Sequence, residues 1–211
     1  MIKLERIMGI VAIVSILMKL ALIHGAGIFV LLSLMLLAGI YYPFGFVFFN
    51  GIGLFDLFKK DAYKAVSKWR IVGAIAVGIC LSAICMGIMF KIQYYPGANV
   101  MLVSGLEMVL IVTIVAFMKW LKQRDDYYIK MFKRIAIIGG FGLVMALTPA
   151  LTIEKIKYHN YPNYIKAMEE YLKHPKDEAL RQKMLLEYRK VITPTQGFRE
   201  NTKGMSEEPL K

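Results

Sequence analysis

A short polar stretch separates two long apolar runs in the middle of the chain: Phe90-Lys91-Ile92-Gln93-Tyr94-Tyr95-Pro96-Gly97-Ala98-Asn99. A related stretch occurs earlier, also between apolar runs: Met18-Lys19-Leu20-Ala21-Leu22-Ile23-His24-Gly25-Ala26-Gly27. Lys19 corresponds to Lys91 and Gly25 to Gly97, each at an offset of 72 residues. This repetition predicts a duplicated helix–loop–helix hairpin.

Composition places both hairpins in a membrane. The 211 residues are 57% hydrophobic, and the mean hydropathy of +0.52 lies outside the range of ordinary soluble domains. Several apolar runs of about 17 to 23 residues are long enough to cross a hydrocarbon layer of about 30 Å. We therefore predict an all-α, polytopic helical membrane protein that contacts the lipid bilayer.

The strong positive charge of the chain is also explained by a membrane location. The net charge is +12, which in a soluble protein would suggest a nucleic-acid partner. Here the cations cluster between apolar runs, a pattern that membrane topology produces. We therefore expect no nucleic-acid partner.

About five transmembrane helices are predicted, from two repeated hairpins plus one further helix. The segments are 1–58 (first hairpin), 59–70 (basic connector), 71–118 (second hairpin), 119–134 (basic connector), 135–153 (fifth helix) and 154–211 (a short soluble helical tail with a disordered end).

Within the first hairpin, the helix over 7–23 resembles a signal peptide in length. Lys19 interrupts its apolar core and no convincing cleavage site follows, so we expect a retained helix. The second helix starts near Ile28, and Pro43 is expected to kink it or end it near Tyr42. Residues 44–58 are apolar but carry polar and glycine residues, which leaves open whether they span, re-enter or lie at the interface.

The distribution of cations predicts an orientation. The amino end and the two basic connectors carry two, five and six Lys or Arg residues, whereas each repeated loop carries one lysine. By the positive-inside rule the amino terminus and both connectors are cytoplasmic. In a bacterial inner membrane, five spans would then place the tail in the periplasm.

The tail shows a different pattern. Its apolar positions recur at helical spacing and Pro175 divides them into two groups, which predicts two short amphipathic helices. The positions are Ile165, Met168 and Leu172, then Leu180, Met184, Tyr188 and Val191. Residues after Pro194 have the composition of a disordered segment.

Three charged residues are candidates for a proton or ion-pair site. Lys19 and Lys91 occupy equivalent places near the outer ends of their helices, where a lysine can also simply extend its ammonium to the headgroups. Glu107 is the only carboxylate inside the first four apolar runs, so it should face the bundle interior, find a partner or be protonated. Lys91 is its expected partner, and the pair is either a proton-binding site or a structural ion pair.

The repeated loops form an outer-loop motif made of His24, Gly25, Tyr94, Pro96 and Gly97. The two glycines are expected to adopt positive φ angles in tight turns, and the aromatic rings to lie at the membrane interface.

The third helix carries a stripe of small residues. Ala74, Gly78 and Ser82 are spaced by four, which predicts close contact with another helix. Cys80 and Cys85 point about 140° apart on a helix, so they are expected to pack as small apolar side chains.

No catalytic constellation can be assembled from this sequence. We find no nucleophile–base arrangement, no phosphate-cradling loop, no paired carboxylates and no metal-ligating cluster. The sequence therefore predicts a protein that is not an enzyme, with no cofactor and no metal.

The second polar stretch, followed by Val100-Met101-Leu102 and Gly105-Leu106, resembles the amino-terminal membrane hairpin of GldL. GldL is the inner-membrane motor subunit of Bacteroidota gliding motility and type IX secretion. Its pattern is roughly F-K-I-x-H-W-P-G-A-N and then M-L-x-x-G-L-x-x-E. About 30 residues match closely, and about 110 are covered if both copies count.

The resemblance implies a subunit that packs around the membrane helix of a single-span partner and uses the proton-motive force. Lys91 matches the family's membrane lysine, whereas Tyr94 replaces its histidine and Val109 its motor glutamate. Glu107 lies two residues away, about 200° around the helix. We therefore expect a distant relative of the motor.

Three functions follow from these observations. The first is a non-enzymatic scaffold or regulatory subunit of a bacterial envelope complex, either as a homo-oligomer or with a single-span partner. The second is a motor or ion-coupled component using Lys91 and Glu107. The third is a small transporter.

Overall fold

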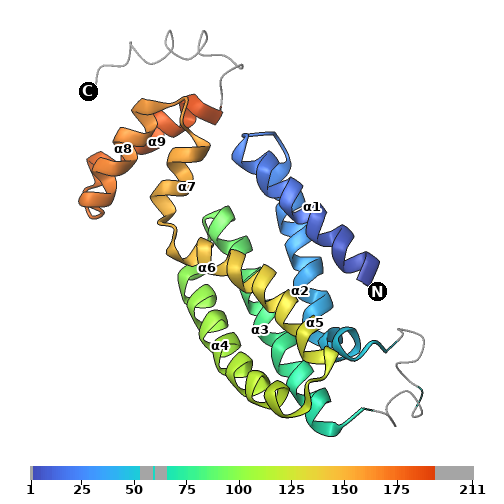
Figure 1. Cartoon of the computed structure of the whole chain (residues 1–211). Coiled ribbons are helices and arrows are strands. Elements are labelled where there is room, and N and C mark those ends of the chain that lie inside the picture. Colours follow the sequence, from blue (N-terminus) through green and yellow to red (C-terminus); the bar gives the residue numbers. More distant parts are fainter. Residues whose placement is uncertain (1, 53–58, 60–65, 193–211) are drawn as a thin grey trace, which may run out of the picture. The chain divides into compact units, whose positions relative to one another are not determined.

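The structure is a computed structural model that describes residues 2–52, 59 and 66–192. It divides into two units, which we name the helix bundle (Met1–Ile153) and the tail unit (Glu154–Lys211). The described residues of both units form helices and turns and contain no strand (Figure 1). The prediction of an all-α chain is confirmed.

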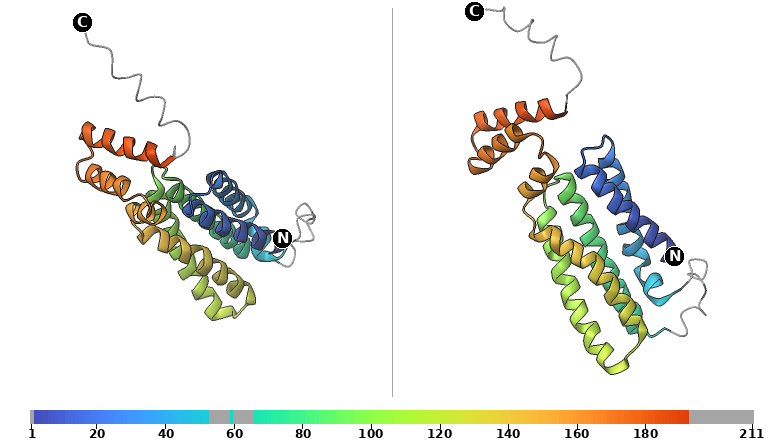
Figure 2. Two further views of the ribbon diagram at one scale, coloured as in Figure 1. Left: turned by 90° about the horizontal axis from the view of Figure 1, so that it is seen from above. Right: turned by 45° about the horizontal axis from the view of Figure 1, so that its top comes forward.

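Four long helices make up most of the bundle: α1 (Ile2–Leu20), α2 (Ala26–Asn50), α3 (Lys68–Gln93) and α4 (Ala98–Gln123). The chain continues with α5 (Asp126–Arg134), a π-helical segment η3 (Ile135–Gly139), α6 (Gly140–Leu147) and the start of α7 (Ala150–Lys157). In space α3 lies between α2 and α4, while α1 packs chiefly on α2 (Figure 2). The central helix of the bundle is therefore α3.

Three described helices are long and apolar enough to cross a membrane: Ala26–Val47 in α2, Lys68–Gln93 in α3 and Ala98–Gln123 in α4. A fourth candidate is a pair of helices, Asp126–Leu147 and Ala150–Lys157, which are bent by 92° at the break between them. The helix α1 is not among the candidates, because four charged residues lie within it. The structure thus has three or four candidate spans, and the fifth span remains a prediction.

The second helix does not end at Pro43, as the sequence suggested it could. It continues through Pro43 to Asn50 and is capped by Gly51 in a left-handed conformation. Proline removes one backbone hydrogen bond, but tertiary packing can offset that loss. Here Gly45, just past the proline, rests against α3. Residues 44–50 therefore belong to α2, while 53–58 lie outside the described residues.

The predicted second connector and fifth helix also differ from the structure. Most of the connector 119–134 is helical, since α4 runs to Gln123 and α5 starts at Asp126. Asp125 makes this sharp turn possible by accepting a hydrogen bond from the amide of Tyr127 (2.9 Å). Pro149 then breaks the expected helix over 135–153 at Thr148, which takes an extended conformation.

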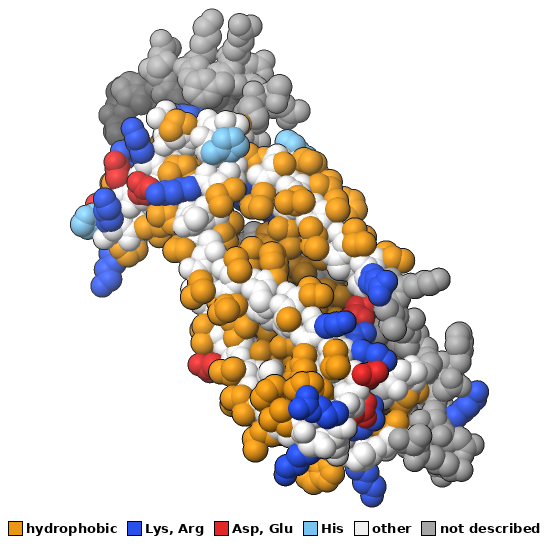
Figure 3. All heavy atoms as spheres, viewed as in Figure 1, with side chains coloured by type: hydrophobic (Ala, Val, Ile, Leu, Met, Phe, Trp, Pro, Cys, Tyr) orange, Lys and Arg blue, Asp and Glu red, His pale blue; other side chains and the backbone are white. Residues whose placement is uncertain are grey.

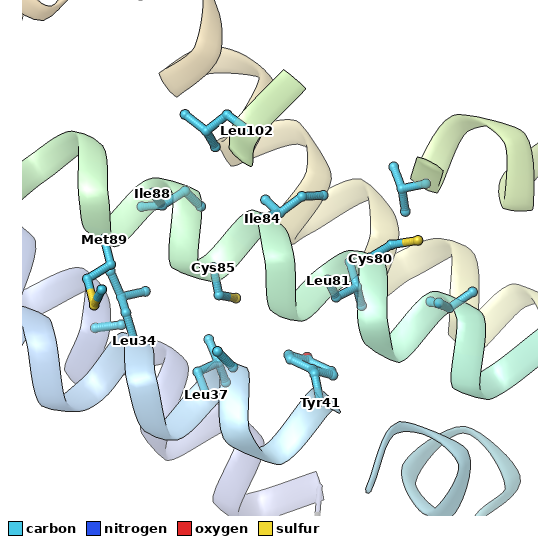
Figure 4. Close-up of a cluster of buried hydrophobic side chains, with 14 of the residues drawn as sticks. Leu34, Leu37, Tyr41, Cys80, Leu81, Ile84, Cys85, Ile88, Met89 and Leu102 are labelled. Atoms are coloured by element: carbon cyan, nitrogen blue, oxygen red, sulfur yellow. The ribbon is translucent and has the colours of Figure 1, made fainter. Parts of the chain in front are cut away.

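The core of the bundle forms where α2, α3 and α4 meet. Figure 4 shows Leu34, Leu37 and Tyr41 of α2 facing α3, with Leu102 of α4 on the opposite side. Cys80 and Cys85 are free thiols buried in this core, which confirms their prediction as packing residues.

Polar and apolar side chains are segregated on the bundle surface. Hydrophobic side chains cover the middle of the visible face, and Lys and Arg gather at the end where α4 meets α5 (Figure 3). This is the distribution expected of helices that cross a membrane and leave their basic ends at one interface.

The tail unit contains the two predicted amphipathic helices, α8 (Pro162–Lys173) and α9 (Glu178–Ile192). They pack against each other, with Met168 and Val191 buried between them and Leu172 exposed. Pro175 lies in the turn, and Asp177 caps α9 by accepting hydrogen bonds from two backbone amides.

Candidate functional site

The two repeated loops have the same backbone structure. Gly25 and Gly97 have φ angles of 79° and 82°, and each directly precedes the next helix, as predicted for tight turns. Leu22 and Tyr94, which are also equivalent residues, have φ angles of 59° and 64°. The same local sequence pattern therefore produces the same turn twice.

Lys91 is buried in the last turn of α3. Only 4% of this residue is exposed, and its ammonium donates a hydrogen bond to Oδ1 of Asn99 on α4 (2.7 Å). Both partners belong to the second hairpin, so the contact closes the hairpin just below its turn. A cation held by one neutral amide is an unusual group in an apolar bundle.

Lys19 lies in a different environment, although it is the equivalent residue. The position equivalent to Asn99 is Gly27, which has no side chain. Gln93 of the second hairpin enters this space and donates a hydrogen bond from its amide to the carbonyl of Gly27. The ammonium of Lys19 and the amide of Gln93 both lie within 3.5 Å of the point where a Cβ of Gly27 would stand. The loop ends of the two hairpins therefore meet at Gly27.

Glu107 does not face the bundle interior, and it does not pair with Lys91. It is exposed on α4 and makes no hydrogen bond or ion pair within the described part of the chain. The buried residues of α4, which face the bundle, are Leu102, Gly105, Val109 and Ala116. Glu107 follows Gly105 by two residues, so it points to the opposite side of the helix.

The remaining members of the outer-loop motif are exposed. His24 and Pro96 lie on the surface of the turns. Tyr94 is 40% exposed, and its hydroxyl donates a hydrogen bond to the carbonyl of Ala150 (2.8 Å). This contact ties the second turn to the start of α7.

The small-residue stripe of α3 makes a close helix contact, as predicted. A Cβ on Gly78 would lie 2.5 Å from the carbonyl oxygen of Tyr41 and 3.1 Å from the Cα of Gly45. Ala74 and Ser82 are buried on either side. Two facing glycines thus let the backbones of α2 and α3 approach closely, which joins the first hairpin to the second.

Sequence reasoning missed a polar cluster at the other end of the bundle. Arg134 donates hydrogen bonds from Nε and one Nη to the two carboxylate oxygens of Glu5 (2.7 and 2.9 Å), and the hydroxyl of Tyr41 donates to the same carboxylate (2.5 Å). The guanidinium also lies over the ring of Phe49, 5.2 Å from its centroid. This cluster joins α1, α2 and α5. One signal was available, because Glu5 is the only acidic residue before Asp56.

A second cluster forms the core of the tail unit. The rings of Tyr158, Tyr164 and Tyr188 pack together, with centroids 4.9 Å apart for the first pair and 5.4 Å for the second. The hydroxyl of Tyr164 donates to the buried carboxylate of Glu154 (3.3 Å). Burial raises the pKa of each of these phenols, so they stay protonated at neutral pH. The cluster is a packed core.

Comparison with known proteins adds no assignment. No protein-family model, curated protein or solved structure matches this chain. In the described residues, no three side chains of His, Cys, Asp or Glu come together in a way that could hold a metal ion. The main features of the structure are two hairpins joined by a glycine contact, the buried Lys91 and the exposed Glu107.

Proposed function

We propose that this chain is a non-enzymatic, multi-pass protein of the bacterial inner membrane that serves as a scaffold or regulatory subunit of an envelope complex. We further propose that its hairpins are distant relatives of the GldL hairpin. The match in sequence around Lys91 supports this relationship. The repeated turn geometry of the two loops supports a duplication within the chain.

One observation carries the proposal of a complex. Glu107 lies nine residues into α4, which places it about 14 Å below the start of the helix at 1.5 Å per residue. It is exposed there among apolar side chains such as Met108 and Leu110, which are 48% and 60% exposed. A carboxylate that faces lipid at this depth is unfavourable. A further protein helix that covers this face of α4 would remove the penalty.

We propose five spans, namely α1 to α4 and the bent pair of helices that follows. The pairing of Glu5 with Arg134 and of Arg70 with Asp125 supports this arrangement, because both contacts lie at the basic ends of the helices. Lys19 and Gln93 meet at the opposite end. By the positive-inside rule the basic end is cytoplasmic and the tail unit periplasmic.

The test is to measure the native mass of the full-length protein after gentle extraction from its own membranes, and to identify the proteins that co-purify. We expect a homo-oligomer or a complex with a single-span partner. Glu107→Leu should weaken this assembly, whereas Leu110→Val, an apolar exchange one turn away, should not. A monomer with no co-purifying protein would contradict the proposal.

A second candidate function is an ion-coupled component that uses Lys91. It is supported by the burial of this cation beside a neutral amide. Proton flux into vesicles that contain the protein should then fall in Lys91→Met and stay unchanged in Lys122→Met. Equal fluxes in the two variants and the unmodified protein would remove this candidate.

A further inference from the structure

A small cavity lies at the basic end of the bundle, between α3, α4 and α5. Its volume is about 50 Å³, and Arg70, Gly73, Val115 and Lys119 are among the residues that line it. The site lies apart from Lys91 and Glu107. The functions proposed for those two residues therefore do not account for this cavity.

Arg70 is held in place with part of its guanidinium unused. One Nη donates to Asp125 (2.7 Å), and the guanidinium carbon lies 4.3 Å from the ring centroid of Tyr127. Its Nε is buried and has no hydrogen-bond partner among the described residues. Burying an N–H group without a partner is costly. Because 28% of the Arg70 side chain is exposed, a ligand that supplies an acceptor can reach the guanidinium group from the surface.

Lys119 adds a second cation to the same cavity. Its ammonium lies 5.0 Å from the ring centroid of Trp69 and makes no hydrogen bond or ion pair within the described ranges. Together, Arg70 and Lys119 set two positive charges against the single negative charge of Asp125. The site therefore has a net charge of about +1, which matches one phosphodiester.

The rest of the site is apolar and opens to the surface. A Cβ on Gly73 would meet no atom within 4 Å, so this glycine leaves a gap beside α4. Val115 lines the same cavity and is 51% exposed, and Trp69 at its rim is 72% exposed. An exposed tryptophan beside cations is typical of the level of lipid headgroups. An inorganic anion would use the charges but leave the apolar gap unfilled.

We propose that this site binds an anionic phospholipid, with its phosphate at Arg70 and Lys119 and an acyl chain in the gap at Gly73. The proposal rests on the membrane location given under Proposed function, and it is independent of any protein partner. Basic pockets between membrane helices are suited to this class of ligand because charge and apolar area are recognised together.

The test uses the fluorescence of Trp69. The chain has two tryptophans, so Trp120→Phe leaves Trp69 alone. The full-length variant is placed in phosphatidylcholine vesicles that contain a minor fraction of phosphatidylglycerol with brominated chains, or the same fraction of brominated phosphatidylcholine. We expect stronger quenching by phosphatidylglycerol. Equal quenching by both lipids would overturn the proposal.

Two variants separate the contributions of charge and shape. Lys119→Gln should weaken the binding of phosphatidylglycerol about fivefold, whereas Lys122→Gln, an equal loss of charge on the exposed side of the same helix, should not change it. Gly73→Leu should abolish the preference by filling the gap. If Lys119→Gln and Lys122→Gln behave alike, the attraction is nonspecific and the proposal fails.

Inorganic phosphate distinguishes a lipid headgroup from a free anion. Added phosphate should not relieve the quenching by brominated phosphatidylglycerol. If phosphate does relieve the quenching in the parent variant, and if Gly73→Leu still prefers phosphatidylglycerol, the site binds free anions. The lipid proposal is then wrong. Native mass spectrometry of the protein with Trp120 intact gives the same ranking of lipids without relying on that replacement. Because these readouts need no partner, they can succeed even if the proposed complex is not found.

Discussion

The two hairpins share a turn but differ in how they hold their lysines. In each hairpin, a backbone amide just after the first helix donates a hydrogen bond to the carbonyl five residues earlier. The pairs are Ile23 to Met18 (3.0 Å) and Tyr95 to Phe90 (2.8 Å). The helices α2 and α4 begin at equivalent residues, Ala26 and Ala98. The local structure is therefore a true repeat.

The surroundings of the lysines are not repeated. In the second hairpin Lys91 is covered and bonded to Asn99 within the same hairpin. In the first, Gly27 stands at the position of Asn99, and Gln93 from the other hairpin enters the space. The second hairpin thus supplies the hydrogen-bond partner of its own lysine. In the first hairpin, the equivalent space is filled by a side chain from the second.

Local sequence sets the turns, whereas contacts between helices hold the bundle together. The turn needs only short-range bonds and a glycine with positive φ, so similar sequences give it twice. The burial of a side chain depends on what packs over it, and α3 is covered on two sides while α1 is covered chiefly by α2.

The largest effect is expected at the glycine contact between the hairpins. Gly78→Leu forces a side chain against the backbone of α2, where a Cβ alone would lie 2.5 Å from the carbonyl oxygen of Tyr41. We expect a loss of about 3 kcal/mol in the free energy of unfolding, measured by denaturant titration in detergent followed by circular dichroism. The control is Gly73→Ala on the same helix, where a Cβ meets nothing within 4 Å. Similar losses in both variants would show that the contact at Gly78 has no special role.

The next effect concerns the buried lysine. Asn99→Ala leaves the ammonium of Lys91 without its acceptor, and we expect a loss of about 2 kcal/mol in stability. At the equivalent position of the first hairpin, Gly27→Ala should cost less than about 1 kcal/mol, because its nearest neighbour is the movable end of Lys19. Adding Lys91→Met to Asn99→Ala should restore part of the loss. Equal losses at the two equivalent positions would mean that the hairpins hold their lysines in the same way.

A smaller and equal effect is expected in the two turns. Gly25→Ala and Gly97→Ala each place a Cβ at positive φ, with no other atom within 4 Å. Each should therefore lose about 1 kcal/mol from backbone strain alone. The thermal unfolding of the two variants in the same detergent measures this. A clear difference between them would show that the turns are not equivalent.

The smallest effect is a coupling between the hairpins. Gly27→Asn would crowd Gln93, and Gln93→Ala would remove the amide that now enters the first hairpin. Combined, the two changes would give the first hairpin its own asparagine, as in the second. We expect the double variant to be more stable than the sum of the single changes predicts, by about 1 kcal/mol. Simple additivity would indicate that Gln93 does not occupy the place of the missing side chain.

Much of the fold followed from patterns along the chain. The apolar runs predicted the candidate spans, because length and hydropathy alone set whether a helix can cross a lipid layer. The repeated loops predicted the positive φ angles of Gly25 and Gly97. The stripe at Ala74, Gly78 and Ser82 predicted a close contact, because such spacing forms one smooth face.

Other features could not be read from the sequence. Pro43 lies within a continuous helix because Gly45 packs on α3, a contact between residues far apart in the chain. The prediction that Glu107 faces the bundle interior was wrong, since helical spacing shows which residues share a face but not which face is covered.

The amino-acid sequence alone determined that the chain is helical, apolar enough for a membrane and built from two similar turns, because these properties arise from short-range sterics and composition. Tertiary structure decided which charges are buried and with whom. Lys91 bonds to Asn99, Glu5 to Arg134, and Glu107 faces outward. The pairing of Glu5 with Arg134 joins residues 129 positions apart, and only the packing of whole helices brings such groups together.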